Sequence, residues 1–481
     1  MLQMPAMLLS VACVVLLVRV VRKPFETLSV RTHAVLTLLL VAQLLVEGPL
    51  LRMLPAYAVI IVAEAITLAR ALGRSTPGLI GQMSGSGILS FSVLAQLAAP
   101  SATSAAAPGP FQVSLQPLSM TLNGEVPGGF EPGCPVNGPF VRLWYPVIDV
   151  DPAGTSVVAT YWSSWRARLR AQSQMVAPPS GRDGRYRLLL VFPGWEGTQV
   201  DNLSLVRHLV SRGFVVASFE YPKARRECGD AENADTAGMD FSSAARTART
   251  LELADARVRS RATDAVRLLD RLATLRFENI GASFTQLLNL ESVGIAGFSL
   301  GGAVAAEASV IDPRFSAAVN IDGLHFADAA EQGVAAAYLL ISDDTPLPSM
   351  ADLNASDPER RNSAWVVAQD ARRSRDSIQR HGGTFMSIAG TRHLNFTDSA
   401  LHLWPWQRSA VGSIAPHRAL QILDDYVAAF FESRLEGKPS LLLQAASSTY
   451  PEVSLQRIAP RQSAQTAANP GKPDRLELAS R

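Results

Sequence analysis

The chain has 481 residues, of which 48% are hydrophobic, and its 44 basic and 42 acidic side chains leave a net charge of +2. This near balance, without a long run of one sign, argues against a dedicated nucleic-acid surface. Three cysteines are too few for a disulfide framework, so Cys134 and Cys228 either pair in an oxidising compartment or stay as free thiols. No cluster of Cys and His has metal-ligand spacing, and neither a metal nor another cofactor is expected.

Residues 1–99 are predicted to form a transmembrane region of three to four helices. Apolar runs at 4–21, 33–46 and 54–69 approach the roughly 20 residues that cross a bilayer, and 78–99 would make a weaker fourth span. Basic residues follow the first run instead of preceding it, which is unlike a cleaved signal peptide. A buried helical hairpin of a soluble domain is the alternative interpretation.

The fourth run decides on which side of the membrane the rest of the chain lies. Basic residues between the first two runs and after the third place both loops in the cytoplasm, so a fourth span would lead the chain outside. Residues 100–111, rich in Ala, Ser and Pro, resemble a flexible tether after a membrane exit, which favours the outside. We therefore expect an extracytoplasmic globular domain at 112–440 and a loosely ordered polar tail at 441–481.

From about residue 112, short strand patterns alternate with helix patterns, which implies a largely parallel sheet covered by helices. Residues 222–250 are polar and carry no strand pattern, so we expect a loop excursion over the active-site end of that sheet. The elements predicted before residue 276 are an antiparallel strand pair at 113–122 and 139–145, buried strands at 186–192 and 214–219, and helices at 205–212 and 250–275.

Ser299 lies in the most informative stretch of the chain. An apolar strand pattern at 293–296 runs into Gly297-Phe298-Ser299-Leu300-Gly301, and an Ala-rich helix pattern begins at once. In such a strand–turn–helix the central serine is held in a strained backbone conformation, and the flanking glycines avoid clashes with neighbouring backbone. The helix N-terminus behind it favours a developing oxyanion. The alternative interpretation is a small-residue turn without chemistry.

His393 is the best-placed base for such a serine, which needs a base to remove its proton and an acid to orient that base. It follows the last predicted strand of the sheet. Of the other histidines, one lies within a helix (His208), one precedes a strand (His381), one is too near an acid candidate (His325), two lie further on (His402, His417) and one is in the apolar region (His33). The elements predicted after the serine turn are strands at 317–321, 335–341 and 384–388 and helices at 362–380 and 417–436.

The acid has more than one candidate. Asp322 directly follows the strand after the serine, and Asp343 or Asp344 follows the next strand. All would arrive at the carboxyl edge of a parallel sheet, where the serine also lies. The pattern leaves them nearly even, and the candidate that is not the acid would be an ordinary turn or capping aspartate.

The oxyanion hole would combine two backbone N–H groups. One is that of Leu300, next after the serine, and the other comes from the loop after strand 186–192, most naturally that of Trp195. Trp195 is also compatible with a core aromatic, and its backbone could serve in either case.

Several stretches resemble the platelet-activating-factor acetylhydrolase family, a serine-lipase branch of the α/β-hydrolase fold. They cover about residues 115–435 in the same order, and Arg392-His-Leu-Asn-Phe-Thr-Asp398 is the most specific of them. The others are Gly138-Pro-Phe-Val-Arg-Leu-Trp-Tyr-Pro146, Val191-Phe-Pro-Gly194, residues 209–217 and 258–264, Gly297-Phe-Ser-Leu-Gly-Gly302 and Asn320-Ile-Asp-Gly323.

The resemblance implies Ser299 as nucleophile, His393 as base and Asp322, rather than Asp343, as acid. The chain departs from the family at Pro193-Gly194, where members usually carry His-Gly. The apolar N-terminus is also absent from the secreted animal enzymes and looks like the leader of some bacterial relatives.

Together these observations predict an α/β-hydrolase domain tethered to a bacterial cytoplasmic (inner) membrane, acting as a serine esterase or lipase without a cofactor. The family implies a lipid substrate, a phospholipid with a short or oxidised acyl chain. A carboxylesterase acting on small soluble esters or polyesters is the nearest alternative. A catalytically silent membrane receptor or scaffold that reuses the fold is the non-enzymatic one.

Overall fold

The computed structural model describes residues 109–114, 118–121, 124–125, 139–149, 174–177, 183–195, 202–221, 238–274, 287–403 and 409–461. The predicted transmembrane region, most of the predicted linker, Cys134, Cys228 and the last twenty residues of the predicted tail (462–481) lie outside these ranges. Within them, no helix combines the length and apolar character needed to span a bilayer.

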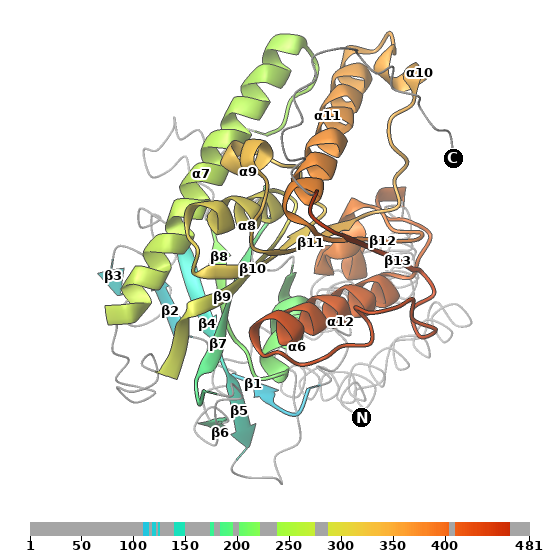
Figure 1. Cartoon of the computed structure of the whole chain (residues 1–481). Helices are drawn as coiled ribbons and strands as arrows, with labels where there is room; N and C mark the ends of the chain where they lie inside the picture. Colours follow the sequence, from blue (N-terminus) through green and yellow to red (C-terminus); the bar gives the residue numbers. More distant parts are fainter. Residues whose placement is uncertain are drawn as a thin grey trace, which may run out of the picture.

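A ten-stranded mixed sheet lies at the centre of the described structure, in the order β13-β12-β11-β10-β9-β7-β8-β4-β2-β3 (Figure 1). From β8 to β12 the neighbouring strands are parallel, whereas β4 and β2 at one side and β13 at the other pair antiparallel. Its strands are β2 (Leu118–Thr121), β3 (Gly124–Glu125), β4 (Phe140–Trp144), β7 (Tyr186–Phe192), β8 (Val215–Glu220), β9 (Leu288–Phe298), β10 (Phe315–Ile321), β11 (Ala337–Ser342), β12 (Gly383–Ile388) and β13 (Val453–Ile458).

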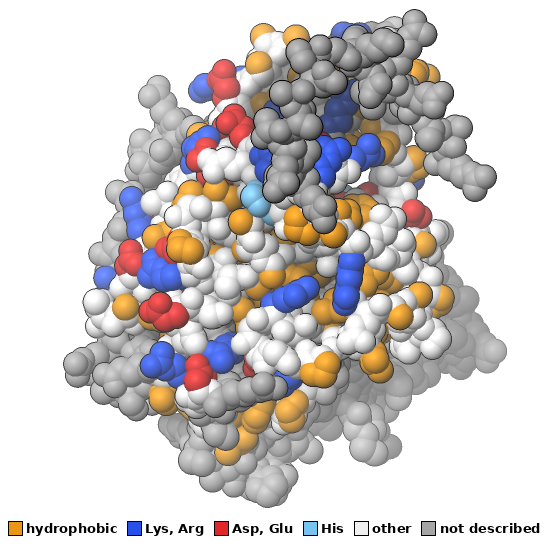
Figure 2. Space-filling view, in the orientation of Figure 1, with side chains coloured by type: hydrophobic (Ala, Val, Ile, Leu, Met, Phe, Trp, Pro, Cys, Tyr) orange, Lys and Arg blue, Asp and Glu red, His pale blue; other side chains and the backbone are white. Residues whose placement is uncertain are grey.

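Helices cover both faces of this sheet, and a small antiparallel sheet of β1 (Gln112–Val113), β5 (Pro146–Asp149) and β6 (Gln174–Val176) lies beside it (Figure 1). On the space-filled face, acidic and basic side chains are interspersed over much of the described surface (Figure 2). The helices are α6 (Leu203–Ser211), α7 (Ala244–Thr274), α8 (Leu300–Ile311), α9 (Ala327–Gln332), α10 (Met350–Leu353), α11 (Pro358–His381) and α12 (Pro416–Leu435), with 3₁₀ turns η6 (His393–Phe396) and η7 (Asp398–His402).

Strand β7 shows why the central strands are apolar throughout. Leu188, Leu190 and Phe192 belong to the core shared with α7 and α8, and Leu189 and Val191 to the core shared with α6 and α12. Successive side chains point to opposite faces of a strand, so a strand covered on both faces needs apolar residues at every position. A mostly parallel sheet covered in this way is consistent with an α/β-hydrolase fold.

The predicted antiparallel pair and the alternating strands and helices are confirmed, with ends shifted by a few residues. Leu118 of β2 lies opposite Leu143 of β4. The predicted loop excursion at 222–250 is wrong in its last part, because α7 already begins at Ala244. Residues 222–237 lie outside the described ranges.

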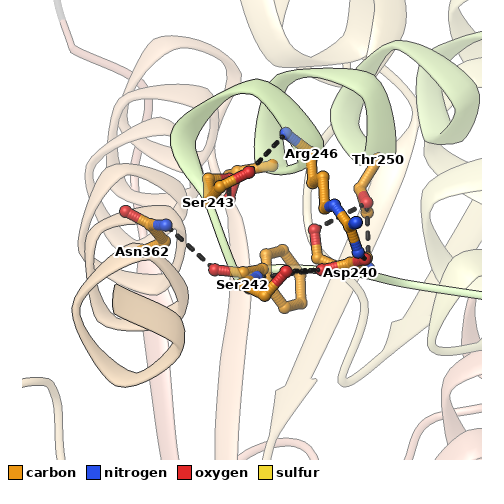
Figure 3. Close-up of polar contacts among 8 residues, drawn as sticks. Asp240, Ser242, Ser243, Arg246, Thr250 and Asn362 are labelled. Carbon is orange, nitrogen blue, oxygen red and sulfur yellow. Dashed lines mark hydrogen bonds and ion pairs between the residues drawn. The ribbon is translucent and has the colours of Figure 1, made fainter. Parts of the chain in front are cut away.

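A hydrogen-bonded turn precedes α7 and explains its early start (Figure 3). Asp240 accepts hydrogen bonds from the Ser242 amide and from Arg246, at 2.9 and 2.7 Å. These donors, with the Ser242 hydroxyl first among them, lower the pKa of Asp240 to about 2. Asn362 of α11 donates to the Phe241 carbonyl at 2.9 Å, which ties the turn to the neighbouring helix. The polar residues that suggested a loop therefore form the turn that leads into α7.

Strand β13 differs from the prediction of a loosely ordered tail. It pairs antiparallel with β12 along its whole length, from Val453 opposite Ile388 to Ile458 opposite Gly383. Tyr450, just before it, is buried. No side chain of β13 is fully buried, and several are exposed, as suits an edge strand. The segment therefore lacks the apolar pattern by which the inner strands are recognised.

Replacing Phe431 by Ala should lower the free energy of unfolding by about 3–5 kcal/mol. Phe431 is fully buried on α12, and its ring lies so close to β9 that a Cβ on Gly294 would come within 2.7 Å of it. The matched control is Leu441→Ala, because Leu441 is 83% exposed and surface substitutions usually change stability by less than about 0.5 kcal/mol. Denaturant unfolding of both variants measures the difference, and equal stabilities would contradict this account of the core.

Candidate active site

Ser299 stands on a sharp turn between β9 and α8. Its backbone has φ 56° and ψ −122°, a left-handed conformation that a residue with a Cβ rarely adopts. Its amide donates to the carbonyl of Ile321, the last residue of β10, at 2.8 Å. The neighbouring strand thus holds the strained residue at the carboxyl edge of the sheet, as the sequence predicted for this turn.

The glycines on either side of the serine are required by close backbone contacts. A Cβ on Gly297 would lie 2.1 Å from the Gly301 carbonyl oxygen, and one on Gly301 would lie 2.3 Å from that of Phe192. Neither distance is compatible with a side chain. Strand, turn and helix therefore pack backbone to backbone around Ser299.

Asp322 is the carboxylate that meets His393. The Nδ1 of His393 donates to Oδ2 of Asp322 at 2.6 Å, and the other carboxylate oxygen accepts the Asp343 amide at 2.9 Å. Asp322 also has a positive φ of 56°, and its amide donates to the Ile341 carbonyl at 2.8 Å. Both oxygens are thus occupied, so the carboxylate can fix one tautomer and one orientation of the imidazole.

Asp343 and Asp344, which the pattern left open as acids, have other contacts. Asp343 accepts hydrogen bonds from the amide and hydroxyl of Thr345, at 3.0 and 2.7 Å, in a local turn. Burial raises the pKa of Asp343, and the charge of Asp322 acts in the same direction. Asp344 accepts the Gly390 amide at 2.8 Å. These contacts fit the turn-aspartate alternative.

The imidazole of His393 lies against the residue before the serine. Its ring centroid is 4.5 Å from that of Phe298, and 45% of its side chain is exposed. By contrast, His325 is buried and contacts Tyr338 and Ser374, at 2.9 and 3.0 Å. Of these two, His393 is therefore the one that a substrate from solvent can reach.

The loop that carries His393 is anchored to the start of α6. The amide of Ser204 donates to the Asp398 carboxylate at 2.9 Å, and the side chain of Asn202 donates to the Phe396 carbonyl at 3.2 Å.

Asp424 of α12 is buried nearby, and its Oδ1 has no hydrogen-bond partner among the described residues. Burial raises the pKa of Asp424 well above its usual range, and the charges of Asp398 and Asp425 act in the same direction.

The two predicted oxyanion donors belong to the first turn of α8 and to the loop after β7. Leu300 is the first residue of α8, where an amide has no intrahelical acceptor. The loop after β7 packs against the turn that carries Ser299, since a Cβ on Gly194 would lie 3.5 Å from the Ser299 Cβ. Trp195, next in that loop, is half-buried, and its ring stacks under the guanidinium of Arg257 at 4.2 Å.

The sequence reasoning missed the side chains that hold this loop and the turn after β10. Arg261 of α7 donates to the Gly194 carbonyl at 3.1 Å, and Asn320 bonds both the amide and the carbonyl of Gly323, at 2.8 and 3.0 Å. Asn320-Ile-Asp-Gly323 stands out as a motif in the sequence, but its hydrogen bonds depend on the tertiary structure. In the described ranges, no group of three or more His, Cys, Asp or Glu side chains could hold a metal ion.

Comparison with known proteins gives one sequence relative and a looser structural likeness. No protein-family model matches the chain. A "probable 1-alkyl-2-acetylglycerophosphocholine esterase" from Arthroderma benhamiae is 28% identical over 172 residues, which are 34% of this chain and 42% of that protein. A solved ferulic acid esterase from Streptomyces cinnamoneus has a TM-score of 0.48 at 24% identity, over 73% of this chain and 98% of the other. The chain therefore matches less than half the length of that sequence relative.

Replacing Asp424 by Asn should give a gain in stability that grows as the pH rises from the ordinary pKa of 3.8 toward neutral pH. Because the pKa of Asp424 is raised in the folded protein above its ordinary 3.8, the unfolded chain releases this proton first, and stability is lost with rising pH. The Asn side chain has no such proton to release, so the stability of the variant does not fall for this reason. Melting temperatures across this pH range measure the effect, with the exposed Asp376→Asn as control. A difference that stays constant with pH would contradict a protonated Asp424.

Proposed function

We propose that this protein is a serine ester hydrolase with Ser299 as nucleophile, His393 as base and Asp322 as acid. The observation that carries the proposal is the 2.6 Å hydrogen bond between His393 Nδ1 and Asp322, beside a serine held at φ 56° at the edge of the next strand. The similarity to a probable acetylglycerophosphocholine esterase supports the same reaction class.

In this mechanism the Asp322 carboxylate holds the proton of His393 on Nδ1, so that Nε2 can accept a proton. Nε2 removes the hydroxyl proton of Ser299 as its oxygen attacks the ester carbonyl. The same imidazolium then returns the proton to the leaving alcohol. A water molecule, activated by His393 in its turn, hydrolyses the acyl-enzyme and restores the serine.

The negative charge that develops on the carbonyl oxygen is held by the amides of Leu300 and Trp195. Leu300 adds the positive end of the α8 dipole to its own N–H group. Trp195 belongs to a loop whose backbone contacts the turn that carries Ser299 directly. Because these donors are fixed by the fold before the substrate arrives, they need no reorganisation during the reaction.

We further propose that the substrate is a phospholipid with a short or oxidised acyl chain, and that the catalytic domain works beside a membrane. The name of the sequence relative specifies a 2-acetyl ester, and the motifs at 392–398 and 297–302 resemble the platelet-activating-factor acetylhydrolase family. The apolar runs in residues 1–99 would anchor the domain on the extracytoplasmic side of the membrane.

Ser299→Ala and Asp322→Asn should remove p-nitrophenyl acetate hydrolysis, with a fall in kcat of about 10⁴ for Asp322→Asn because the imidazole loses its tautomer. Asp343→Asn is the matched control, since Asp343 bonds Thr345 and touches Asp322 only through its amide. Its kcat should stay within about tenfold of the wild type. Membranes containing each variant are also labelled with a fluorophosphonate, which reacts with activated serines.

Loss of labelling in Ser299→Ala with retention in Asp343→Asn supports the assignment. An Asp343→Asn variant as inactive as Asp322→Asn would move the acid to Asp343. If folded wild-type protein neither labels nor hydrolyses any ester, the enzyme proposal fails, and a receptor or scaffold that reuses the fold takes its place.

Hydrolysis of phosphatidylcholines with acetyl, butyryl and palmitoyl groups at the sn-2 position tests the substrate class. We expect kcat/KM to fall by at least about tenfold from acetyl to palmitoyl, because a pocket built for a short chain rejects added methylenes sterically. Equal rates on all three would favour a general lipase. Activity on p-nitrophenyl esters without activity on any phospholipid would favour a carboxylesterase.

A further inference from the structure

A buried arginine holds the peptide that carries one of the two oxyanion donors. Arg261 of α7 is 3% exposed, and its Nη1 donates to the Gly194 carbonyl at 3.1 Å. The Gly194 carbonyl and the Trp195 N–H belong to the same peptide unit. In a trans peptide these two groups point in opposite directions, and no cis peptide occurs in the described residues.

This geometry ties the direction of the Trp195 amide to Arg261. When the carbonyl points at α7, the N–H of the same peptide points away from α7. Gly194 at the other end of the unit lies against the serine, since a Cβ on this glycine would come within 3.5 Å of the Ser299 Cβ. Pro193, the preceding residue, has no N–H to offer. The hydrogen bond that Arg261 makes to the Gly194 carbonyl then sets the direction of the Trp195 N–H toward a substrate on Ser299.

Two stacking contacts keep the arginines of α7 in place behind this loop. The guanidinium of Arg261 lies 4.1 Å from the ring centroid of Tyr221, and the hydroxyl of Tyr221 donates to Asp264 at 3.3 Å. One helical turn earlier, the guanidinium of Arg257 lies 4.2 Å from the ring centroid of Trp195 itself. Aromatic rings therefore orient both cations, and backbone and side chain of the oxyanion loop are fixed from the same helix.

The charge of Arg261 also changes the strength of the donor. A cation that bonds a peptide carbonyl draws electron density through the peptide and makes its N–H a better donor. The effect is larger in a buried site, where water does not screen the charge. A lysine would keep the charge but could not make a planar, stacked contact with Tyr221.

We propose that Arg261 is a positioning residue of the oxyanion hole, which aims the Trp195 amide at the reacting carbonyl and polarises it. The inference rests on the proposed esterase function and adds to it a group outside the triad. Arg261 does not touch the substrate. Its contribution should therefore appear in the transition state, where the oxyanion forms, and leave substrate binding nearly unchanged.

The test compares Arg261→Met and Arg261→Lys with the wild type, using the full chain and p-nitrophenyl acetate. Active sites are counted by fluorophosphonate labelling carried to completion, so that kcat refers to folded protein. We expect Arg261→Met to lower kcat by about 10–100-fold, less than the loss of a whole oxyanion donor, with KM within about twofold. Arg261→Lys should fall between Met and the wild type. Arg249→Met, an exposed arginine of the same helix, is the matched control and should behave as wild type.

A second substrate separates this role from general damage to the site. In the thionoester analogue of p-nitrophenyl acetate, sulfur replaces the carbonyl oxygen, and an amide donor placed for oxygen stabilises the larger sulfur poorly. The ratio of oxo-ester to thionoester rates should therefore fall in Arg261→Met by about tenfold, since only the oxo-ester uses the donor fully.

An unchanged kcat per labelled site, or equal losses on both esters, would overturn the role of Arg261. If Arg261→Met does not label, Arg261→Lys decides by the same rate ratio. Failure of the esterase function itself looks different, because then the wild type would show no hydrolysis that depends on Ser299.

Discussion

Two backbone hydrogen bonds step across the carboxyl ends of three neighbouring strands, and the site depends on them. The Ser299 amide donates to the last residue of β10, and the Asp322 amide donates to Ile341 near the end of β11. Each bond continues the ladder by one residue after its strand has ended. Both donors have positive φ, a conformation that costs of order 1–3 kcal/mol and persists only where surrounding structure enforces it. Sheet pairing therefore stabilises the strained backbone at both positions.

This arrangement brings the turn that carries Ser299 and the loop that carries Asp322 to the same edge of the sheet, in a fixed position relative to each other. Strands β9, β10 and β11 are parallel, and Phe298, Ile321 and Ile341 lie opposite one another near their carboxyl ends. Residues that follow these strands therefore arrive side by side. His393 then reaches Asp322 from beyond β12, two strands away from β10, on a loop fastened to α6. Residues far apart in the chain meet because parallel strands end at a common edge.

The back of the site is built from charge and aromatic rings rather than from the apolar packing of the rest of the core. Arg257 and Arg261 are nearly fully buried. Arg257 stacks on the ring of Trp195, and Arg261 stacks on the ring of Tyr221. Burying cations requires compensating contacts, and stacked faces and a peptide carbonyl supply them here. The helix α7 thereby acts as a support for the loop after β7 as well as a cover for the sheet.

The order of strands and helices, the strand–turn–helix around Ser299 and the place of His393 after a strand could all be predicted from the amino-acid sequence. These features are local: short continuous apolar runs mark the buried strands, two glycines at fixed spacing flank the serine, and His393 follows the last parallel strand. The strand pattern left Asp322 and Asp343 open as acids, because both follow strands. The family resemblance implied Asp322, and in the structure it is Asp322 that contacts His393, whereas Asp343 contacts Thr345. Strand β13 and the burial of Arg257 and Arg261 could not be predicted, because both depend on contacts with distant parts of the chain. An edge strand needs no apolar face, and an arginine on a helix looks like a solvated residue until another part of the chain covers it.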